Sequence, residues 1–452
     1  MSSKITFYGG AGTVTGANFL LDTGEKKILV DCGSLEREHV CDVANAAAFL
    51  YDPKSVDALV VTHAHADHIG RIPKLVKDGF RGTIHSTGAT RDLAEVMFED
   101  AIGIMHGDAK YHGCSILYEK EDVALALSLW EEHEYHAPFR IGDVSVELFD
   151  AGHILGSSLV RFNRNDKKLL FTGDLGNSPE PLLNDTESPE GANYLVMESV
   201  YGDRQHQERE ERLNKLQEAV VDARDRHATL LVPSFSLERT QILLFELNNM
   251  VERGKLDPIH VYLDAPLAIR VTEIYRKYQK ILNPDVRAHF ARGDDPFVFK
   301  NLKLTMHTGE SEAIHDAPNP KIVIAGAGMG VGGRIRAHFK RFAPDPHTTI
   351  LFVGYQSPGS LGGHILSGEK KVQIDGESVE VRARVSMIEG FSGHKDGDGL
   401  FKFVEQAGNS LEKVFVTMGE PKSSQFLAGR IRDSLKIETI VPEPAQSVEI
   451  SF

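Results

Sequence analysis

One run of six residues, His63-Ala64-His65-Ala66-Asp67-His68, constrains this chain more than any other feature. Zinc sites need neutral imidazoles and carboxylates held close together on stiff backbone, and the run supplies four such groups. A short buried strand is predicted at Ala58–Thr62, directly before the run, and a helix is predicted to begin near Ile69. The run therefore lies in a loop at the carboxyl end of a strand, where successive side chains can point inward.

The spacing within the run favours two metal ions. His63 and His65 can reach one ion, while Asp67 and His68 reach a second. The competing interpretation is a set of surface histidines near a helix start, with Asp67 as the helix cap. It leaves the ligand types further along the chain unexplained.

Those further ligand types are His153 and Asp174, and each follows a predicted strand. A lone histidine after a strand is usually a surface residue. In a chain that already carries the six-residue run, two more ligand types at strand ends instead predict one metal centre assembled from three segments.

The chain has 452 residues, more than one ordinary hydrophobic core accommodates, and this length predicts at least two domains. The pattern of predicted strands and helices also changes along the chain. The first two hundred residues read as an α/β sandwich, with strands at Ile5–Tyr8, Asn18–Leu21, Lys27–Asp31, Ala58–Thr62, Ser145–Asp150, Ser158–Phe162 and Lys168–Thr172, and helices at Ile72–Asp78, Arg91–Met105 and Lys120–His133. From about His206 strands alternate with helices, which is typical of a parallel sheet. Near the end, helices are predicted at Phe391–Gln406 and Gln425–Ser434, around a strand at Lys413–Thr417.

Composition narrows the class of protein. The formal net charge of −15 argues against a general nucleic-acid coat protein, although not against an enzyme that handles nucleic acid in one local cleft. No apolar run approaches a membrane span, and the N-terminus does not read as a signal peptide. Three cysteines with no CxxC spacing predict no paired framework, so a cytoplasmic location fits best.

The metal motifs resemble those of the metallo-β-lactamase superfamily. The resemblance rests on the six-residue run together with Asp31, His153 and Asp174. It implies that one zinc ion is held by His63, His65, His153 and Asp174, and a second by Asp67, His68 and Asp174. Asp174 would bridge the two ions, and Asp31 would support the site without binding metal.

The second half resembles the β-CASP nucleases of that superfamily. Glu198-Ser199-Val200-Tyr201-Gly202-Asp203-Arg204 is similar to their first specific motif, and Phe391-Ser392-Gly393-His394 to their second. Between them, PSFSLERTQ, DAPLA, GMGVGGR and GYQSPGSLGG resemble landmark segments in the family's order. The resemblance is strongest to bacterial and archaeal relatives of the mRNA cleavage-and-polyadenylation endonuclease.

This resemblance implies an αββα sandwich with an inserted parallel-sheet α/β domain. The expected boundaries are 1–205 for the first part of the metallo-β-lactamase domain, 206–386 for the β-CASP domain and 387–452 for the return. The implied activity is zinc-dependent phosphodiester hydrolysis, with RNA cut endonucleolytically in a cleft between the domains. Single-stranded RNA is the expected substrate, and a homodimer is a possible assembly.

Catalytic roles follow from the same resemblance. His394 would be the general acid that protonates the leaving oxygen, and Glu198 would orient it. Asp67 would orient the attacking water. The candidates for phosphate or RNA binding are Arg204, Arg239, Gly332, Gly333 and Arg334.

The chain also departs from the family pattern. Met418 stands where RNA-directed members have a histidine, and a thioether is a poor zinc ligand beside carboxylates. The second zinc ion is therefore expected to bind more weakly. Further departures, each expected to remove a phosphate-binding donor or add negative charge, are Glu238, Ala265, Gly326, Ala327 and Gly363.

Two alternative functions stay open. The chain could be a weakly active or non-catalytic nucleic-acid-binding relative, which the loss of the histidine at position 418 favours and the complete first ligand set opposes. It could instead hydrolyse smaller phosphodiesters or esters, with the inserted domain acting as a lid.

Overall fold

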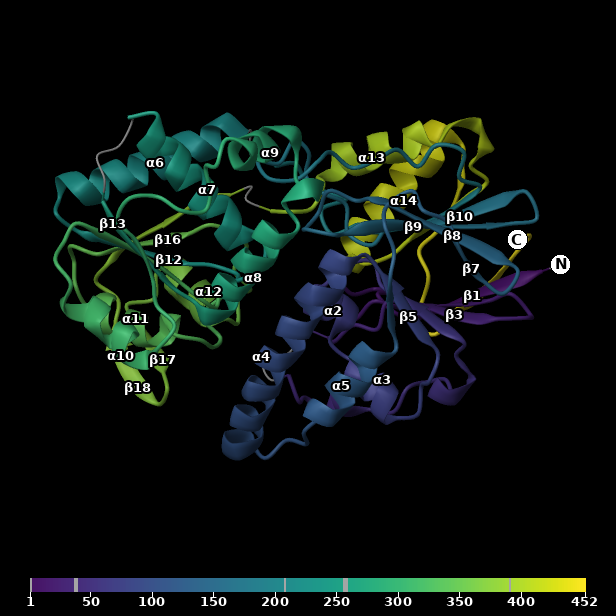
Figure 1. Ribbon diagram of the computed structural model, residues 1–452, viewed down its shortest axis with the longest axis horizontal. Coiled ribbons are helices and arrows are strands. Elements are labelled where there is room, and N and C mark those ends of the chain that lie inside the picture. The colour runs from purple at the N-terminus through teal and green to yellow at the C-terminus, as the bar shows by residue number, and fades with distance from the viewer. Residues whose placement is uncertain (1, 36–39, 207–208, 255–258, 390–391) are drawn as a thin grey trace. The chain divides into compact units, whose positions relative to one another are not determined.

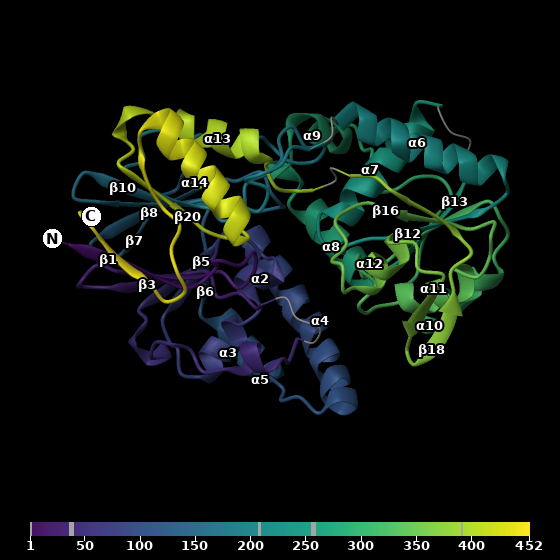
Figure 2. The same cartoon turned by 180° about the vertical axis from the view of Figure 1, so that it is seen from behind.

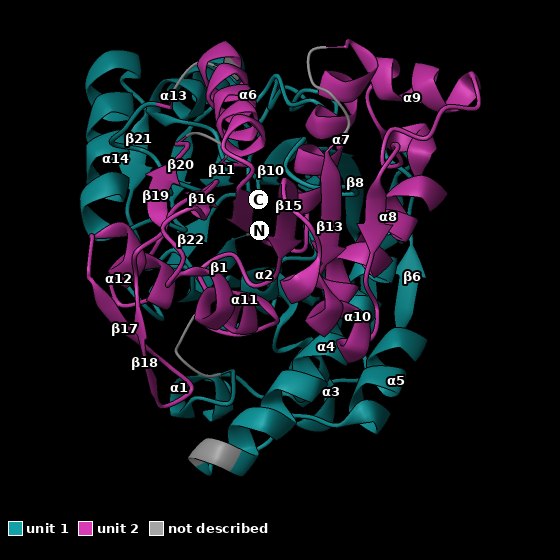
Figure 3. Cartoon of the chain, turned by 90° about the vertical axis from the view of Figure 1, so that its left-hand side faces the viewer, with its two compact units in different colours: residues 1–205, 394–452 teal, residues 206–393 magenta. Residues whose placement is uncertain are grey.

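The computed structural model describes residues 2–35, 40–206, 209–254, 259–389 and 392–452. The chain divides into two compact units, coloured separately in Figure 3. The first unit comprises residues 1–205 and 394–452, and the second comprises residues 206–393. None of the described helices is long and apolar enough to cross a membrane.

Two sheets form the centre of the first unit. Among the described residues, the first sheet has the order β22 (Ser447–Ile450), β1 (Ser3–Gly9), β2 (Asn18–Asp22), β3 (Lys27–Val30), β4 (Ala58–Val60), β5 (Thr83–Ser86) and β6 (Trp130–Glu132). The second sheet has the order β21 (Glu438–Ile440), β20 (Lys413–Val416), β11 (Tyr194–Met197), β10 (Lys167–Phe171), β9 (Ser158–Arg164), β8 (Val144–Asp150) and β7 (Phe139–Ile141).

The main core of this unit lies between the two sheets. The rings of Phe7 in β1 and Phe415 in β20 are 5.4 Å apart, and both residues are fully buried. They belong to one cluster of apolar side chains drawn from both sheets. Each buried phenylalanine contributes about 1.5–3 kcal/mol, so this cluster holds the sheets face to face.

Helices cover both outer faces of the paired sheets (Figures 1 and 2). On the second sheet, α13 (Gly397–Gln406) and α14 (Pro421–Leu435) bury a cluster that includes Leu400, Leu427 and Val414. The helices on the side of the first sheet are α1 (Val43–Ala46), α2 (Ala66–Ile69), α3 (Ile72–Lys77), α4 (Gly88–His112) and α5 (Lys120–Ser128). The unit is therefore the αββα sandwich predicted from the sequence.

Strand direction determines where functional residues gather. Strands β3, β4, β5 and β6 run parallel. In the second sheet β9 is antiparallel to both β8 and β10, while β10, β11 and β20 are parallel. Consequently β8, β10, β11 and β20 all end at the same edge of their sheet, and the residues that follow them come together there.

The second unit contains a parallel sheet, as predicted. Among the described residues its order is β14 (Leu302–Leu304), β13 (His260–Asp264), β15 (Lys321–Ala325), β12 (Thr229–Pro233), β16 (Thr349–Phe352) and β19 (Arg384–Met387), next to a separate hairpin of β17 (Lys371–Ile374) and β18 (Glu377–Glu380). Its helices are α6 (Arg209–Asp225), α7 (Arg239–Glu252), α8 (Pro266–Lys277), α9 (Pro284–Ala291), α10 (Thr308–Ala313), α11 (Ile335–Phe342) and α12 (Leu361–Leu366).

Some local predictions are wrong. The helix predicted at Lys120–His133 ends at Ser128, because the edge strand β6 begins at Trp130 and pairs with β5. The helix predicted at Phe391–Gln406 begins only at Gly397, where the Asp396 side chain accepts a hydrogen bond from Gly399 N. Phe391 itself lies outside the described residues.

The expectation that the cysteines are unpaired is also wrong. Cys41 and Cys114 form a disulfide, with their Cα atoms 5.7 Å apart and a sequence separation of 73 residues. Cys32 is free and buried. Because neither partner belongs to a short-spaced motif, the sequence contains no signal for this pair.

A buried carboxylate organises one end of the second unit. Asp264, at the end of β13, is fully buried. Its oxygens accept hydrogen bonds from Thr305 Oγ1 (2.6 Å), Ser311 Oγ (2.5 Å) and Arg334 NH1 (2.6 Å), and one oxygen lies 2.7 Å from His338 Nε2. Burial would raise the pKa of Asp264, but these partners together hold it well below its usual range.

The low pKa of Asp264 predicts how stability depends on pH. The stabilisation is complete above the unfolded pKa of about 4 and is lost as the pH falls towards the folded-state pKa. We expect Asp264→Asn to lower the free energy of unfolding by about 3 kcal/mol at pH 7. In urea titrations the difference from wild type should shrink below about pH 4; a difference that is equal at pH 3 and pH 7 would contradict this.

Candidate metal centre

The sequence-predicted site residues follow strand ends at one edge of the first unit. His63 comes after β4, His153 after β8, Asp174 after β10, Glu198 after β11 and Met418 after β20. Strands β4, β10, β11 and β20 end in buried apolar residues, and the functional residue follows within one to three positions.

Tight packing of backbone fixes the six-residue run. The helix that leaves it, α2, begins at Ala66 rather than near Ile69, so Asp67 and His68 lie in the first helical turn. Its carbonyls accept hydrogen bonds from the segments beside it, with Ala17 N donating to Asp67 O (2.8 Å). A Cβ atom on Gly33 would lie 1.5 Å from Asp67 O, so only glycine fits there.

The first donor group consists of His63, His65, His153 and Asp174. Nδ1 of His65 is 3.1 Å from Nε2 of His63 and 3.1 Å from Nε2 of His153. Oδ2 of Asp174 is 3.3 Å from Nε2 of His63 and 3.5 Å from Nε2 of His153. Four ligand atoms at these separations match a tetrahedral site, in which neighbouring ligands lie about 3.3 Å apart.

A second donor group consists of Asp67, His68 and Asp174. Nε2 of His68 is 3.3 Å from Oδ1 of Asp174 and 3.8 Å from Oδ2 of Asp67. Among the described atoms, Nε2 of His68 and Oδ1 of Asp174 are both buried without a hydrogen-bond partner. Buried polar atoms are normally satisfied, so these two orphaned atoms fit a cation between them.

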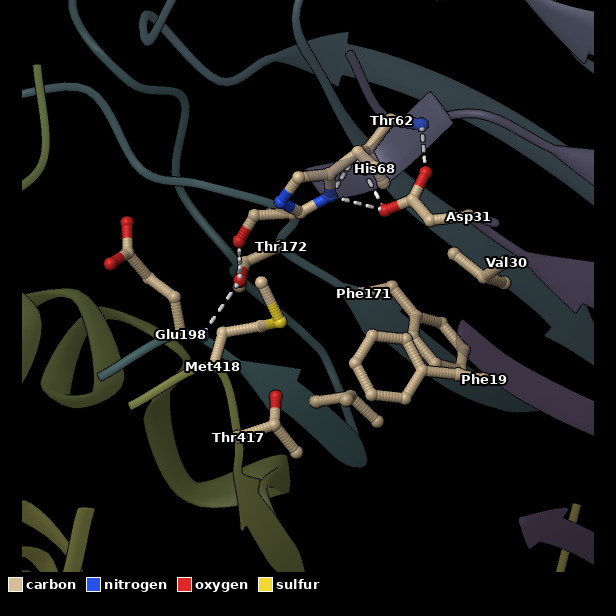
Figure 4. Close-up of a pocket in the computed structure, with 12 residues that line it drawn as sticks. Phe19, Val30, Asp31, Thr62, His68, Phe171, Thr172, Glu198, Thr417 and Met418 are labelled. Atoms are coloured by element: carbon tan, nitrogen blue, oxygen red, sulfur yellow. Dashed lines mark hydrogen bonds and ion pairs between the residues drawn. The ribbon is translucent and has the colours of Figure 1, made fainter. Parts of the chain in front are cut away.

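Asp31 lies beside the ring of His68, as Figure 4 shows. Its Oδ2 lies 2.7 Å from Nδ1 of His68, while Thr62 donates to the same carboxylate through both N and Oγ1, each at 2.8 Å. A carboxylate on the far nitrogen fixes the tautomer and ring orientation of a metal-binding histidine. The structure places Asp31 on the ring nitrogen of His68 opposite the one that faces Asp174.

Burial and charge set the ionisation of the donors. Burial lowers the pKa of His63, His65 and His153, which favours neutral rings. Burial raises the pKa of Asp67 to about 6. Unlike the other three histidines, His68 has a raised pKa. Burial lowers this pKa, but the Asp174, Asp31 and Asp67 carboxylates raise it well above its usual value.

Glu198 and His394 form a pair beside the donor groups. Nδ1 of His394 lies 3.1 Å from both carboxylate oxygens of Glu198 and 3.9 Å from Oδ2 of Asp174. Glu198 Oε1 also accepts a hydrogen bond from Leu175 N (2.6 Å). Although burial lowers the pKa of His394, Glu198 and Asp174 raise it to about 10, which favours the imidazolium.

Sequence reasoning missed two residues that build this site. Thr62 holds Asp31, and Oγ1 of Thr172 accepts a hydrogen bond from Glu198 N (3.2 Å). Both directly precede motif residues at strand ends. The signal in the sequence that could have identified them was a threonine directly before each motif.

Met418 lies at the base of the centre. It is buried and lines a water-sized cavity of about 10 Å³ together with Asp31, His68 and Glu198 (Figure 4). Its side chain also belongs to the apolar cluster between the sheets. Its backbone has φ 45°, a left-handed conformation that histidine tolerates better than most side chains.

The predicted phosphate-binding residues are distributed over both units. Arg204, in the first unit, is half-exposed and donates to Asp203 (3.1 Å). In the second unit, NH1 of Arg239 donates to Val353 O (3.2 Å). Gly332 and Gly333 lie in the turn before α11, where Gly333 has φ 71°.

Arg334 is engaged within its own unit. Its guanidinium donates to Asp264 Oδ1 (2.6 Å), Thr305 O (3.0 Å) and Met306 O (2.7 Å). The Glu238 carboxylate, expected to add negative charge near the cleft, is instead buried and accepts a hydrogen bond from the Tyr275 hydroxyl.

The fold and the two donor groups define a metallo-hydrolase. Sequence comparison agrees: the profile of the Metallo-beta-lactamase superfamily matches residues 11–234, that of the Beta-Casp domain residues 240–365, and that of the Zn-dependent metallo-hydrolase RNA specificity domain residues 378–442. The chain belongs to the β-CASP family of the metallo-β-lactamase superfamily and is a metal-dependent hydrolase.

Several curated relatives are similar along most of the chain. "Ribonuclease TTHA0252" of Thermus thermophilus is 38% identical, over 89% of this chain and 90% of the relative. "Transcription termination factor FttA" of Methanosarcina mazei is 32% identical, over 96% of this chain and 70% of the relative. A crystal structure of a protein of unknown function from Enterococcus faecalis V583 shares the fold, with a TM-score of 0.59 at 12% identity over the full length of both chains.

The contacts of Arg334 predict a structural role. We expect Arg334→Gln to lower the free energy of unfolding by about 2–3 kcal/mol, because it removes the charged donor from buried Asp264 and the donor to two carbonyls. Arg204→Gln removes an equally charged but half-exposed side chain and should change it by less than about 0.5 kcal/mol. Urea unfolding of both variants measures the difference, and equal midpoints would refute the assignment.

Proposed function

We propose that this protein is a zinc-dependent phosphodiester hydrolase that cleaves single-stranded RNA endonucleolytically. The observation that carries the proposal is the position of Asp174. Its Oδ2 faces the first donor group and its Oδ1 faces the second, while His394 lies 3.9 Å away, paired with Glu198. Two cation sites beside an acid–carboxylate pair suit hydrolysis of a phosphodiester.

The two sites would differ in strength. His63, His65, His153 and Asp174 offer a complete set of four ligands, and the second site has only Asp67, His68 and Asp174. Met418 lines the cavity beneath it and supplies a soft thioether that suits zinc poorly beside carboxylates. We therefore assign the tighter zinc ion to the first group.

Divalent ions in these groups would supply Lewis-acid stabilisation of the charge that develops on the phosphate. The protein's own residues handle the protons. The Asp67 carboxylate would accept a hydrogen bond from the attacking water and orient it. The His394 imidazolium would protonate the leaving oxygen, and Glu198 would hold the ring through Nδ1, which leaves Nε2 to donate.

Three observations support RNA as the substrate class. The profile matched at residues 378–442 is that of an RNA specificity domain, one relative is named a ribonuclease, and another is named a transcription termination factor. The chain has a formal net charge of −15, so bound metal ions would supply much of the positive charge that attracts the phosphates of RNA. A cytoplasmic location and a homodimer stay predictions.

Circular single-stranded RNA tests substrate and mode of cleavage together, because a circle offers no end to an exonuclease. We expect wild type with Zn²⁺ to linearise it. His65→Ala should lower the rate at least about 100-fold, since mutating a residue that only hydrogen-bonds to a metal ligand already costs about 10–100-fold in metal affinity or activity. The matched control is His106→Ala, whose ring is half-exposed beside Glu119 on the protein surface.

Three outcomes would reject the proposal. Equal cleavage by wild type and His65→Ala would mean that the metal centre is not responsible. Turnover of bis(p-nitrophenyl) phosphate without cleavage of any RNA would favour the smaller-substrate alternative. Tight RNA binding without turnover of either compound would favour a non-catalytic binding protein.

The position of Met418 predicts a gain of function. Met418→His should increase zinc affinity at the second site by about 10-fold or more and raise the rate of RNA cleavage, because it adds an imidazole to an incomplete ligand set. Met418→Leu keeps the apolar contacts and should not raise affinity. Calorimetric zinc titration measures both variants. Equal affinities in Met418→His and Met418→Leu would contradict the assignment.

A further inference from the structure

The first unit contains a further group of potential metal ligands that shares no residue with the centre described above. It consists of His85 in β5, Glu131 in β6 and His133 just after β6. Nδ1 of His85 is 3.0 Å from Nε2 of His133 and 3.7 Å from Oε2 of Glu131. The three side chains therefore present their ligand atoms to one another.

Strand pairing fixes this group in place. Strands β5 and β6 are parallel, with His85 opposite Glu131. His133 N donates to Ser86 O (2.8 Å), and Trp130 Nε1 donates to Ser86 Oγ (2.8 Å), so β6 continues its attachment to β5 beyond its last residue. A site on paired strands needs little reorganisation to bind an ion.

An aromatic ring from the other sheet holds the two imidazoles. Phe139 in β7 stacks on His133, with ring centroids 3.6 Å apart and an angle of 8° between the planes. It also stacks on His85 at 4.9 Å. The histidines thus close the open edge between the two sheets, where β6 and β7 are the outer strands.

The spacing of the donors matches the first donor group of the same molecule. There, adjacent imidazole nitrogens are 3.1 Å apart and the carboxylate oxygen is 3.3–3.5 Å from them. At the sheet edge, the nitrogens are 3.0 Å apart and the oxygen is 3.7 Å from one of them. Tetrahedral zinc with bonds of about 2.0–2.1 Å requires separations of about 3.3 Å.

Access and local charge suit a cation. His85 is only 5% exposed, His133 is half-buried, and the Glu131 side chain is 63% exposed, so the ligands run from the interior to solvent. Glu132 and Glu134 flank His133 in the sequence, and of these Glu132 lies 3.6 Å from Arg91. The segment is acidic overall, which favours a divalent ion.

We propose that His85 Nδ1, His133 Nε2 and a Glu131 carboxylate oxygen form a separate, structural metal site of the zinc class. Water completes the ligand set, since the protein supplies three groups. The bound ion ties β6 to β5 and stiffens the edge of the sandwich. The site does not depend on the proposed hydrolysis, because it shares no ligand with the centre at Asp174.

Metal stoichiometry tests the site. Tag-free protein is stripped with a chelator and dialysed against micromolar Zn²⁺ at neutral pH, and zinc per chain is measured by mass spectrometry. We expect His133→Gln to hold about one equivalent less than wild type. The matched control is His347→Gln, which removes an exposed histidine that also lies beside a carboxylate, 3.3 Å from Asp345.

A second comparison separates this site from the proposed centre. In a His65→Ala background, adding His133→Gln should again remove about one equivalent of zinc. Glu131→Gln, at an exposed position that tolerates substitution, should weaken binding about tenfold and shift the visible spectrum of bound Co²⁺. Wild type, His133→Gln and Glu131→Gln with the same zinc content and the same Co²⁺ spectrum would overturn the proposal and leave a hydrogen bond between neutral rings.

Discussion

The rest of the centre depends on the carboxylate of Asp174, whose two oxygens face different donor groups. One oxygen faces the imidazoles of His63 and His153 and the other faces His68, so a single buried side chain belongs to both donor groups. Burying a carboxylate is costly unless it is paired. The surrounding rings and any bound cation offset that cost, which couples the formation of the two groups to each other.

The sandwich provides the geometry that this carboxylate needs. Its position follows from β10, which is held between β9 and β11 in the middle of the second sheet. The imidazoles arrive from β4 and β8, which end at the same edge. Because the apolar cluster between the sheets fixes the strands, it also fixes the spacing of the ligand atoms that follow them.

Motifs in which neighbouring residues act together were predictable from the sequence. The six-residue run and the ligands that follow the strands ending at Asp150 and Phe171 came together as expected, because strand ends meet at one edge of a sheet. The parallel sheet of the second unit was predictable because strands alternate with helices along its sequence.

Contacts between distant residues that belong to no recognisable motif were not predictable. The disulfide joins cysteines 73 residues apart, Arg334 reaches Asp264 across 70 residues, and His85 meets His133 across 48. Each pair depends on tertiary packing that no local pattern encodes. In the sequence, a Gly-rich turn followed by Arg334 suggested phosphate binding. Only the fold shows that this guanidinium donates to a buried carboxylate and two carbonyls.

Both donor groups share Asp174, and the second offers only three protein ligands. The zinc content of Asp174→Asn, measured against His65→Ala after dialysis in the same buffer, tests this sharing, because asparagine preserves the shape of the side chain and removes its charge. We expect Asp174→Asn to lose zinc from both groups and His65→Ala to lose mainly the tighter ion. Retention of the wild-type zinc content by Asp174→Asn would contradict it.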